Sequence, residues 1–491
     1  MNLSLLILIP LLTAIGVLFC NGLKQVRNLS LLGAVIQLAL SLFLLTQYWQ
    51  QHTPGSSQMM YEFSYTGFKA LNINYHVGVD GISIAMILLT AFVVLAGVLV
   101  SWNTEKLSKE FFFLLLLLSA GAYGFFISLD LFTLFFFLEI AVIPKFLLIG
   151  IWGSGKKEYS AMKLALMLMG GSALVFVGLA GIYFNTHTFD IIEIAKTPLP
   201  IAVQKFFFPF AFIGFGVFTA LFPFHTWVPD GHSSAPTAAS MFLAGISMKL
   251  GGYGCLRVAT YLMPDAAHAY SWIIILLATI AIIYGAFATM MQTDLKYINA
   301  YSSVSHCGFV LLGIGMLTKT SINGAVLQMV SHGLMTALFF AAIGMIYSRT
   351  HTRLVAQLGG LLKVTPFISS VFVIAGLCSL GLPGFSGFVA EMTVFMGSWQ
   401  NPDMWYRIAT ILACASIVVT AVYILRATGK TVMGPMSDSF LSLKDATWNE
   451  KLAACLLITG IVVIGVAPFL INHLIAPGMD VIMNKLTTAI H

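Results

Sequence analysis

The sequence contains two stretches that decide the fold, Phe222-Pro-Phe-His-Thr-Trp-Val-Pro-Asp230 and Gly381-Leu-Pro-Gly-Phe-Ser-Gly387. Each one places proline or glycine in a long apolar segment, where a membrane helix would be crossing the bilayer. A helix that breaks inside lipid leaves backbone N–H and C=O groups that need protein or water as hydrogen-bonding partners. Such breaks therefore tend to line cavities through which ions pass. Two breaks of the same kind indicate a transport protein.

The composition indicates an integral membrane protein. Of the 491 residues, 59% are hydrophobic and only 9% are charged, against roughly 25% charged residues in an ordinary soluble domain. The net charge of +6 does not require a nucleic-acid partner, because Lys and Arg accumulate in the cytoplasmic loops of membrane proteins. The six cysteines stand singly in apolar runs without the paired spacing of a zinc or cluster site, so we predict core residues and no bound metal.

Apolar runs of about 18 residues or more, the length that crosses a bilayer core, recur along the whole chain. We predict about fourteen transmembrane helices on this criterion. The run at 1–20 lacks a basic start and a small-residue cleavage site, so we expect a retained helix rather than a cleaved signal peptide. Most basic residues fall in one set of alternate loops, which predicts that these loops face the cytoplasm and that both termini lie on the non-cytoplasmic side. The runs lie near residues 1–20, 28–48, 82–101, 111–128, 130–152, 159–184, 206–223, 236–258, 271–291, 297–317, 321–348, 366–400, 405–427 and 452–471.

The two breaks are regularly placed, because Pro223 and Pro383 are 160 residues apart. Predicted helices near residues 111 and 271 are separated by about the same distance, as an internal repeat requires. We therefore predict an all-α fold with two five-helix repeats, inverted because five is odd, each with one broken helix. Alternatively, proline and glycine are simply frequent in membrane helices. The predicted parts are 1–110 (helices 1 to 3), 111–260 (helices 4 to 8), 261–430 (helices 9 to 13) and 431–491 (helix 14 and a tail).

Four charged residues lie far from any predicted helix end, namely Glu139, Lys145, Lys249 and Glu391. Charges at such positions are costly and rare, so each is a functional hypothesis by default. Two acids and two bases can neutralise one another, and each can also change its protonation state, as a proton relay requires. The alternative is a set of structural ion pairs. For Lys145 a further alternative is a side chain that extends to the membrane interface.

Histidines supply a second set of candidates. His306 and His332 lie inside predicted helices beside serines, where imidazole can pass protons between lysine and glutamate at accessible pH. The alternative is that each is a hydrogen-bonded core residue. His225 and His232 lie in the loop of the first break, either as entrance groups at the cytoplasmic edge or as hydrogen bonders that fix the loop.

Further motifs surround these charges: Gly78-Val-Asp-Gly-Ile-Ser83, Glu139 five residues before Pro144, Phe222 to His232, Ala235-Pro-Thr-Ala-Ala-Ser240, Leu243-Ala-Gly-Ile-Ser-Met-Lys249 and Ala300-Tyr-Ser-Ser-Val-Ser-His-Cys-Gly-Phe-Val310. Together they resemble the antiporter-like subunits of respiratory complex I, over most of the chain. Glu391 follows the second break, where sister subunits carry lysine, and there is no long lateral-helix extension. The chain is therefore most similar to the M-type (chain 4) subunit.

The resemblance implies proton translocation within an NADH:quinone oxidoreductase, with Glu139, Lys249, His306, His332 and Glu391 on the proton path. It implies other membrane-arm subunits as partners, sister antiporter-like subunits among them, and an energy-transducing membrane, most simply a bacterial inner membrane. Quinone is used by such a complex, but nothing in the sequence marks a quinone site here. The sequence has no Rossmann fingerprint, cluster-binding cysteine set or haem signature, so we expect no cofactor in this chain and redox chemistry in partner subunits.

One residue expected from the resemblance is missing. The family usually has a lysine on helix 7, paired with the helix 5 glutamate, but this chain has Phe218 there. Lys145 is a candidate replacement, although six positions from Glu139 amount to about 240° around an ideal helix, so the two share a face only if Pro144 distorts the turn. The rival functions are a subunit of a multi-subunit cation/proton antiporter, a membrane-bound hydrogenase subunit and a structural scaffold. The sequence does not separate Na⁺ from H⁺.

Overall fold

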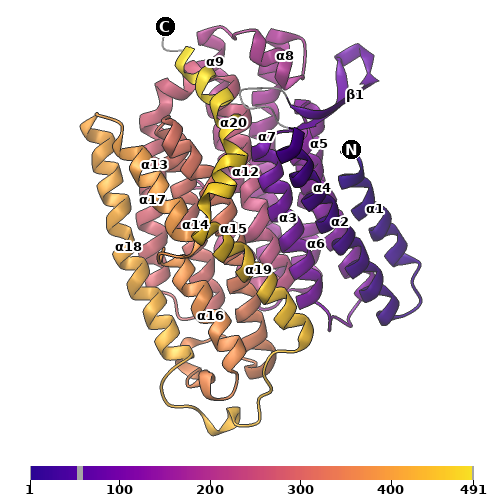
Figure 1. The fold of residues 1–491 in the computed structure, drawn as a ribbon, viewed down its shortest axis with the longest axis vertical. Helices are drawn as coiled ribbons and strands as arrows, with labels where there is room; N and C mark the ends of the chain where they lie inside the picture. The colour runs from indigo at the N-terminus through magenta and orange to yellow at the C-terminus, as the bar shows by residue number, and fades with distance from the viewer. Residues whose placement is uncertain (1, 52–58, 489–491) are drawn as a thin grey trace.

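The computed structural model describes residues 2–51 and 59–488, most of which are helical. The long helices lie side by side in one elongated bundle (Figure 1). The α-helices are α1 (Leu5–Leu18), α2 (Leu23–Gln51), α3 (Gly81–Val100), α4 (Ser108–Ile127), α5 (Leu131–Ile140), α6 (Val142–Trp152), α7 (Lys157–Thr186), α8 (Ile191–Lys196), α9 (Ile201–Thr219), α10 (Trp227–Ser234), α11 (Thr237–Phe242), α12 (Met248–Gly254), α13 (Pro264–Met290), α14 (Leu295–Gly315), α15 (Lys319–Thr350), α16 (Pro366–Ser379), α17 (Ser386–Trp399), α18 (Met404–Thr431), α19 (Trp448–Val466) and α20 (Pro468–Thr488). The other elements are the strands β1 (Met60–Phe68) and β2 (Ile73–Val79), the π segments η2 (Leu243–Ser247) and η3 (Cys255–Thr260), and the 3-10 segments η1 (Lys69–Leu71), η4 (Val355–Gln357), η5 (Leu361–Lys363) and η6 (Asp438–Phe440).

The predicted multi-pass membrane architecture is confirmed. In the described part of the chain, 10 helices are long and apolar enough to cross a membrane. The other predicted runs fall on the short helix α1, on α14, on the irregular helix around α12 and on the broken pair α16 and α17. The number fourteen and the internal repeat stay predictions, because these helices are short, interrupted or more polar.

The prediction of a purely α-helical chain is wrong at one place. Strands β1 and β2 pair antiparallel and form a hairpin, which projects at one end of the bundle (Figure 1). Phe63, Tyr65 and Phe68 favour extended backbone because aromatic side chains fit a pleated surface. From the sequence we predict no element between the runs 28–48 and 82–101, and the aromatic content of this stretch is the signal that could have found the hairpin.

The C-terminal part also differs from the prediction of a tail after the last membrane helix. Residues Pro468–Thr488 form α20, which packs on α3 and α15. Pro468 separates this helix from α19 because its ring removes a backbone donor while its fixed φ suits the first helical turn. The first predicted run is a helix, α1, which packs against α2 and α4.

Both predicted helix breaks are present. The first lies between α9 and α10, and the second lies between α16 and α17. At the second break, Gly381 and Gly384 adopt φ values of +73° and +96°, which disfavour residues with a Cβ. The structure adds an interruption at Ala141, between α5 and α6, and π turns on both sides of α12. Irregular backbone thus lies beside each predicted membrane charge.

The cysteine prediction holds only in part. Cys255, Cys307 and Cys378 are buried, and Cys20 is partly buried. Cys414 and Cys455 are exposed on the helix surface. An apolar run predicts the protein core in a soluble chain, but the lipid-facing surface of a membrane protein is equally apolar. Local hydrophobicity therefore could not distinguish these two environments.

Candidate functional site

Four of the six predicted site residues form one buried cluster. The Nζ atom of Lys249 lies 2.8 Å from Nδ1 of His332, and the imidazole rings of His332 and His306 stack with their centroids 5.3 Å apart. Nδ1 of His306 lies 3.2 Å from Oε1 of Glu391. Lys249 and Glu391 are exposed by only 1% and 4%. The sequence-predicted base, two imidazoles and acid thus lie in contact in this order.

The backbone around Lys249 explains how the ammonium group is held. Lys249 is the second residue of α12, directly after the π segment η2. A π turn changes the regular i to i+4 ladder and is often found at functional sites. Lys249 Nζ donates a hydrogen bond of 2.5 Å to the carbonyl oxygen of Ala244 in η2. The lysine is therefore oriented by its own irregular helix as well as by His332.

Glu391 is positioned by the second break. Its helix, α17, begins at Ser386, and a Cβ on Gly381 would lie 2.9 Å from Oε2 of Glu391. Glycine at 381 thus permits both the positive φ and the approach of the carboxylate. On the other side, Nε2 of His306 lies 3.1 Å from the hydroxyl oxygen of Ser379, the last residue of α16. The broken helix supplies polar contacts to both the acid and the imidazole.

His306 and His332 differ in how fully they are hydrogen-bonded. His306 contacts Ser379, Gln328 and Glu391, so both of its ring nitrogens have partners. His332 has Lys249 at Nδ1, but its buried Nε2 has no hydrogen-bond partner within the described residues. Cys307 Sγ lies 3.9 Å from His332 Nδ1 as a weak further contact. His306 is therefore a core histidine with both ring nitrogens hydrogen-bonded, whereas His332 is not.

Lys145 points into the protein. Its side chain is 1% exposed, and its Nζ lies 5.8 Å from the centroid of the Phe218 ring. Phe218 is the residue of α9 at which the resemblance leads one to expect a lysine. The side chain neither extends to the membrane interface nor faces lipid. A cation from α6 therefore faces the residue that replaces the expected lysine.

Glu139 and Lys145 lie on either side of a one-residue interruption in one membrane helix. Glu139 is near the end of α5, Ala141 lies between α5 and α6 with helical φ and ψ, and Pro144 lies in the first turn of α6. Proline has no N–H for the carbonyl of residue 140, which accounts for the interruption. Within the described residues, Glu139 Oε1 and Lys145 Nζ are buried without hydrogen-bond partners, and they form no direct ion pair. Both charged groups are thus left without a direct partner in this part of the chain.

The histidines of the first break are buried. The ring of His225 stacks on Phe222 with centroids 5.4 Å apart and meets Tyr284 edge-on at 4.8 Å. Neither ring nitrogen of His232 has a hydrogen-bond partner in the part of the chain that the structure describes. His232 therefore does not fix the loop by hydrogen bonds. His225 is held by packing against aromatic rings.

A polar cavity of about 580 Å³ adjoins the first break. Its lining includes Asp230, Tyr297 and Arg353. Lys163 Nζ contacts one carboxylate oxygen of Asp230 at 2.7 Å, and the Tyr297 hydroxyl donates to the other at 3.3 Å. Polar groups in this arrangement can hold water beside the broken helix. Among the described residues no group of three His, Cys, Asp or Glu side chains could hold a metal ion.

Two buried charged contacts were missed by the sequence reasoning. Arg257 in η3 forms an ion pair with Asp80, which also caps α3 by accepting from the N–H of Ser83. Lys296 Nζ donates 2.6 Å to the carbonyl oxygen of Ala235. Both cations lie near the ends of predicted runs, so neither was counted among the charges inside the membrane. Asp80 stands in the quoted Gly78-Val-Asp-Gly motif, and a buried partner for it was the signal that could have found Arg257.

Irregular membrane helices around a buried chain of titratable groups define a class of protein, the polytopic subunits that move ions across a membrane. The comparisons with known proteins narrow this class. Residues 128–418 match the family model described as NADH:quinone oxidoreductase/Mrp antiporter, TM. The chain belongs to this family.

Named relatives and solved structures agree with this assignment. The chain is 34% identical over 476 residues to NADH-quinone oxidoreductase subunit M of Rickettsia prowazekii, covering 95% of each chain. It is 38% identical over 408 residues to NAD(P)H-quinone oxidoreductase chain 4 3 of a Picosynechococcus strain, covering 82% of this chain and 74% of the relative. A chain of respiratory complex I from Thermus thermophilus superposes with a TM-score of 0.89 at 25% identity over 99% of both chains. A chain of the Mrp complex from a Dietzia strain shares the fold, with a TM-score of 0.85 at 18% identity.

Proposed function

We propose that this chain translocates protons as a membrane subunit of an NADH:quinone oxidoreductase of the complex I type. The observation that carries the proposal is the buried succession of Lys249, His332, His306 and Glu391, whose members lie within hydrogen-bonding or ring-stacking distance of one another. A chain of titratable groups inside a membrane protein is costly to bury, and proton transfer is the use that such chains commonly have. The membership in the family supports the same function.

In the proposed relay the proton moves along atoms that the structure places together. The Lys249 ammonium donates its proton to Nδ1 of neutral His332, which leaves a neutral amine and an imidazolium. The unpartnered Nε2 of His332 releases a proton to water, from which His306 accepts it. His306 then transfers a proton from Nδ1 to the carboxylate of Glu391, which lies beside the second break. Each transfer alters the charge felt by the next group at short range.

Glu139 and Lys145 form the other part of the proposed relay. A carboxylate buried without a cation is pushed towards its neutral form, whereas a lysine nearby keeps it charged and ready to switch. Lys145 occupies the space over Phe218 that the missing lysine would fill. We infer that Lys145 replaces that lysine. We propose that water carries the proton from this pair to Lys249.

The proposed fold has fourteen membrane segments and two inverted repeats within 111–260 and 261–430, preceded by 1–110 and followed by 431–491. Two isolated bridges support this. Asp130 pairs with Asp190, and 164 residues later Asp294 pairs with Leu354. The first bridge lies where α7 ends. The second is linked through Arg353 to α10, which contacts the beginning of α7. Equivalent features at opposite ends of one membrane helix are what inversion predicts.

The proposed location is a bacterial inner membrane, with both termini on the non-cytoplasmic side. In support, α1 begins and α20 ends at the end of the bundle that carries the hairpin (Figure 1). Lys106 and Trp152, at the opposite end, contact one another through the indole N–H and a backbone carbonyl. The solved structures with this fold belong to multi-subunit complexes. We therefore propose membrane-arm partners, sister subunits among them, which carry the redox centres and use quinone.

The proposal is tested on the native assembly, purified with its companion subunits and reconstituted in liposomes. NADH oxidation by quinone should drive proton uptake, and Lys249→Ala should lower proton uptake per NADH while leaving the subunit composition intact. Lys24→Met, a change of an exposed lysine, is the control and should have no effect. Copurification of the chain with an assembly that neither oxidises NADH nor pumps protons would refute the proposal.

A cation/proton antiporter subunit is the second candidate, favoured by the fold shared with the Mrp complex. Carboxylates and the carbonyls of a broken helix serve Na⁺ as well as H⁺. The same liposomes distinguish the two. Proton movement driven by a Na⁺ gradient without NADH would favour the antiporter, and proton uptake that requires NADH and ignores Na⁺ would favour the oxidoreductase.

A further inference from the structure

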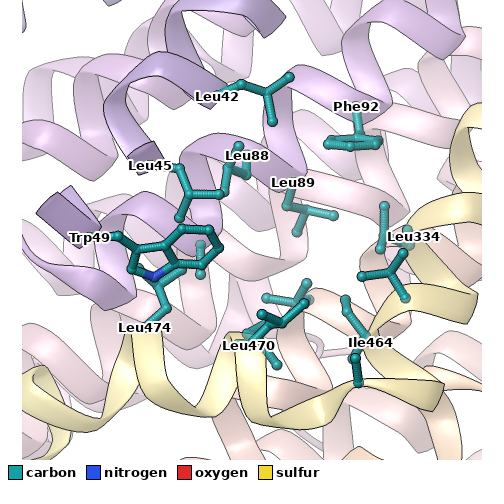
Figure 2. A pocket seen from close by; sticks show the side chains of 16 residues that line it. Leu42, Leu45, Trp49, Leu88, Leu89, Phe92, Leu334, Ile464, Leu470 and Leu474 are labelled. Carbon is teal, nitrogen blue, oxygen red and sulfur yellow. The ribbon is translucent and has the colours of Figure 1, made fainter. Parts of the chain in front are cut away.

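An apolar groove opens on the surface of the bundle, away from the polar relay. It has a volume of about 190 Å³ and is lined by α2, α3, α15, α19 and α20. Its floor consists of buried side chains such as Leu89, Leu334 and Leu474, and its mouth consists of exposed ones such as Leu42 and Val463. Figure 2 shows aliphatic side chains and the Trp49 indole around an open space.

The break between α19 and α20 shapes this groove. Ala467 leaves the helical conformation, with φ of −123° and ψ of 59°, before Pro468 begins α20. Its small side chain lines the groove together with Gly460. A Cβ on Gly460 would lie 3.0 Å from Leu334, so glycine lets α19 approach α15 closely at this level. Small residues at a helix junction thus leave space that the neighbouring side chains do not fill.

The size and chemistry of the groove call for an apolar occupant. Protein interiors contain few voids larger than a water molecule, and an engineered apolar cavity of about 150 Å³ stays dry and binds apolar ligands. Among the described residues that line the groove, the Trp49 indole nitrogen is the only polar side-chain atom, since the others are aliphatic, glycine or Phe92. Water would find almost no hydrogen-bonding partner there. A hydrocarbon therefore fits where water does not.

The shape favours a linear chain parallel to the helices. The lining residues of α2 run from Leu42 to Trp49, which is about 10 Å along the axis at 1.5 Å per residue. A lipid acyl chain runs in the same direction as membrane helices. Helix partners in membranes prefer faces of small residues that allow close backbone approach, whereas Leu42, Trp49 and Val463 make the mouth of this groove bulky.

We propose that the groove is a binding site for one acyl chain of a bilayer phospholipid. The headgroup would lie beyond Trp49, because tryptophan is typical of the membrane interface. At this end of the groove, Gln50 follows Trp49 and His473 precedes Leu474. Both side chains are exposed and can donate hydrogen bonds to a headgroup. The bound chain packs on Val330 and Leu334 of α15.

The test uses the native assembly in liposomes that contain a phosphatidylcholine with a diazirine in the middle of one acyl chain. After illumination, labelled peptides are mapped by mass spectrometry. Label should concentrate on the groove segments 42–49 and 463–474. Ala467→Phe, which fills the groove, should lower this labelling at least fivefold, whereas Ala415→Phe, a matched change of an exposed alanine on α18, should not. Leu470→Trp at the exposed mouth is the second variant if Ala467→Phe does not assemble.

Several results would overturn the proposal. Labelling of the exposed face of α18 as strong as that of the groove would mean ordinary lipid contact. Labelling that persists in both filled variants would mean that the groove does not hold the chain. A polypeptide of the assembly cross-linked to the groove in place of lipid would assign it to a subunit interface. Displacement of the label by a long-chain quinone, but not by unlabelled phospholipid, would assign it to an isoprenoid tail.

Discussion

Replacing Lys145 by methionine removes one positive charge and keeps an unbranched side chain of similar length in a buried space. In the structure, Nζ of Lys145 has no hydrogen-bond partner among the described residues and lies over the ring of Phe218 at 5.8 Å. The packing around the residue therefore depends little on the ammonium group. The main loss is the electrostatic support for Glu139, whose buried Oε1 also has no partner in the same part of the chain.

The size of this loss follows from the burial of the pair. Removing one partner of a fully buried ion pair costs about 3–5 kcal/mol. Glu139 is only partly buried and does not contact Lys145 directly, so we take about 2 kcal/mol, below that range. At 1.36 kcal/mol for each factor of ten in rate, Lys145→Met should slow proton translocation roughly thirtyfold.

The assay is proton uptake by liposomes that contain the assembled complex, measured per NADH oxidised. Lys24→Met serves as the control because Lys24 is exposed. Adding Phe218→Lys to Lys145→Met rebuilds a cation on α9 and should return proton uptake to within about fivefold of the wild type, since half of the lost 2 kcal/mol is worth about that factor. Wild-type pumping by Lys145→Met would refute the reasoning. Loss of pumping without any rescue by Phe218→Lys would refute the replacement of the missing lysine.

Other perturbations test other parts of the structure. Lys249→Ala should lower proton uptake by at least tenfold with subunit assembly intact, and wild-type uptake would exclude Lys249 from the relay. Glu391→Gln should pump at least tenfold more slowly than Glu391→Asp, because only a carboxyl group takes and releases the proton, and equal rates would indicate a structural glutamate. Pro144→Ala restores an N–H that can straighten the helix, and should slow pumping several-fold as measured by the same uptake. In the hairpin, the hydrogen bond to Asp190 raises the pKa of His76. The contact between His76 and Asp190 therefore stabilises the hairpin fully when the pH is below the ordinary histidine pKa. This stabilisation is lost as the pH rises through the raised pKa of His76. Hydrogen exchange of β2, corrected for its intrinsic pH dependence, should accelerate across that pH, and His76→Gln should abolish the extra acceleration.

The helix breaks and the membrane charges could be predicted because their signals are local. Pro223, Gly381 and Glu391 stand in apolar runs where each is unusual, and the cost of a break or a charge in lipid applies whatever the neighbouring helices are. The contact between Lys249 and His332 could not be predicted in this way. It joins residues that are far apart in the chain, and it depends on the π turns before and after α12.

Other features escaped prediction for a different physical reason. The surface of a membrane protein is as apolar as its core, so hydropathy placed Cys414 and Cys455 inside although both are exposed. Arg257 was not counted among the charges inside the membrane because it lies near the end of an apolar run, yet it pairs with buried Asp80. The sequence thus predicted where charged residues and helix breaks lie along the chain. It did not predict which residues surround them, because that depends on how distant helices pack.

The position of Lys145 changes how the first charge pair can respond to a signal. A lysine on α9 would pair with Glu139 across two helices, and their separation would follow the packing of those helices. Lys145 instead shares one interrupted helix with Glu139, so their separation follows the angle between α5 and α6 at Ala141. A small change of that angle moves the ammonium group relative to the carboxylate and changes their interaction at short range. In the proposed relay, the angle at Ala141 thus helps to set the distance between the ammonium group and the carboxylate.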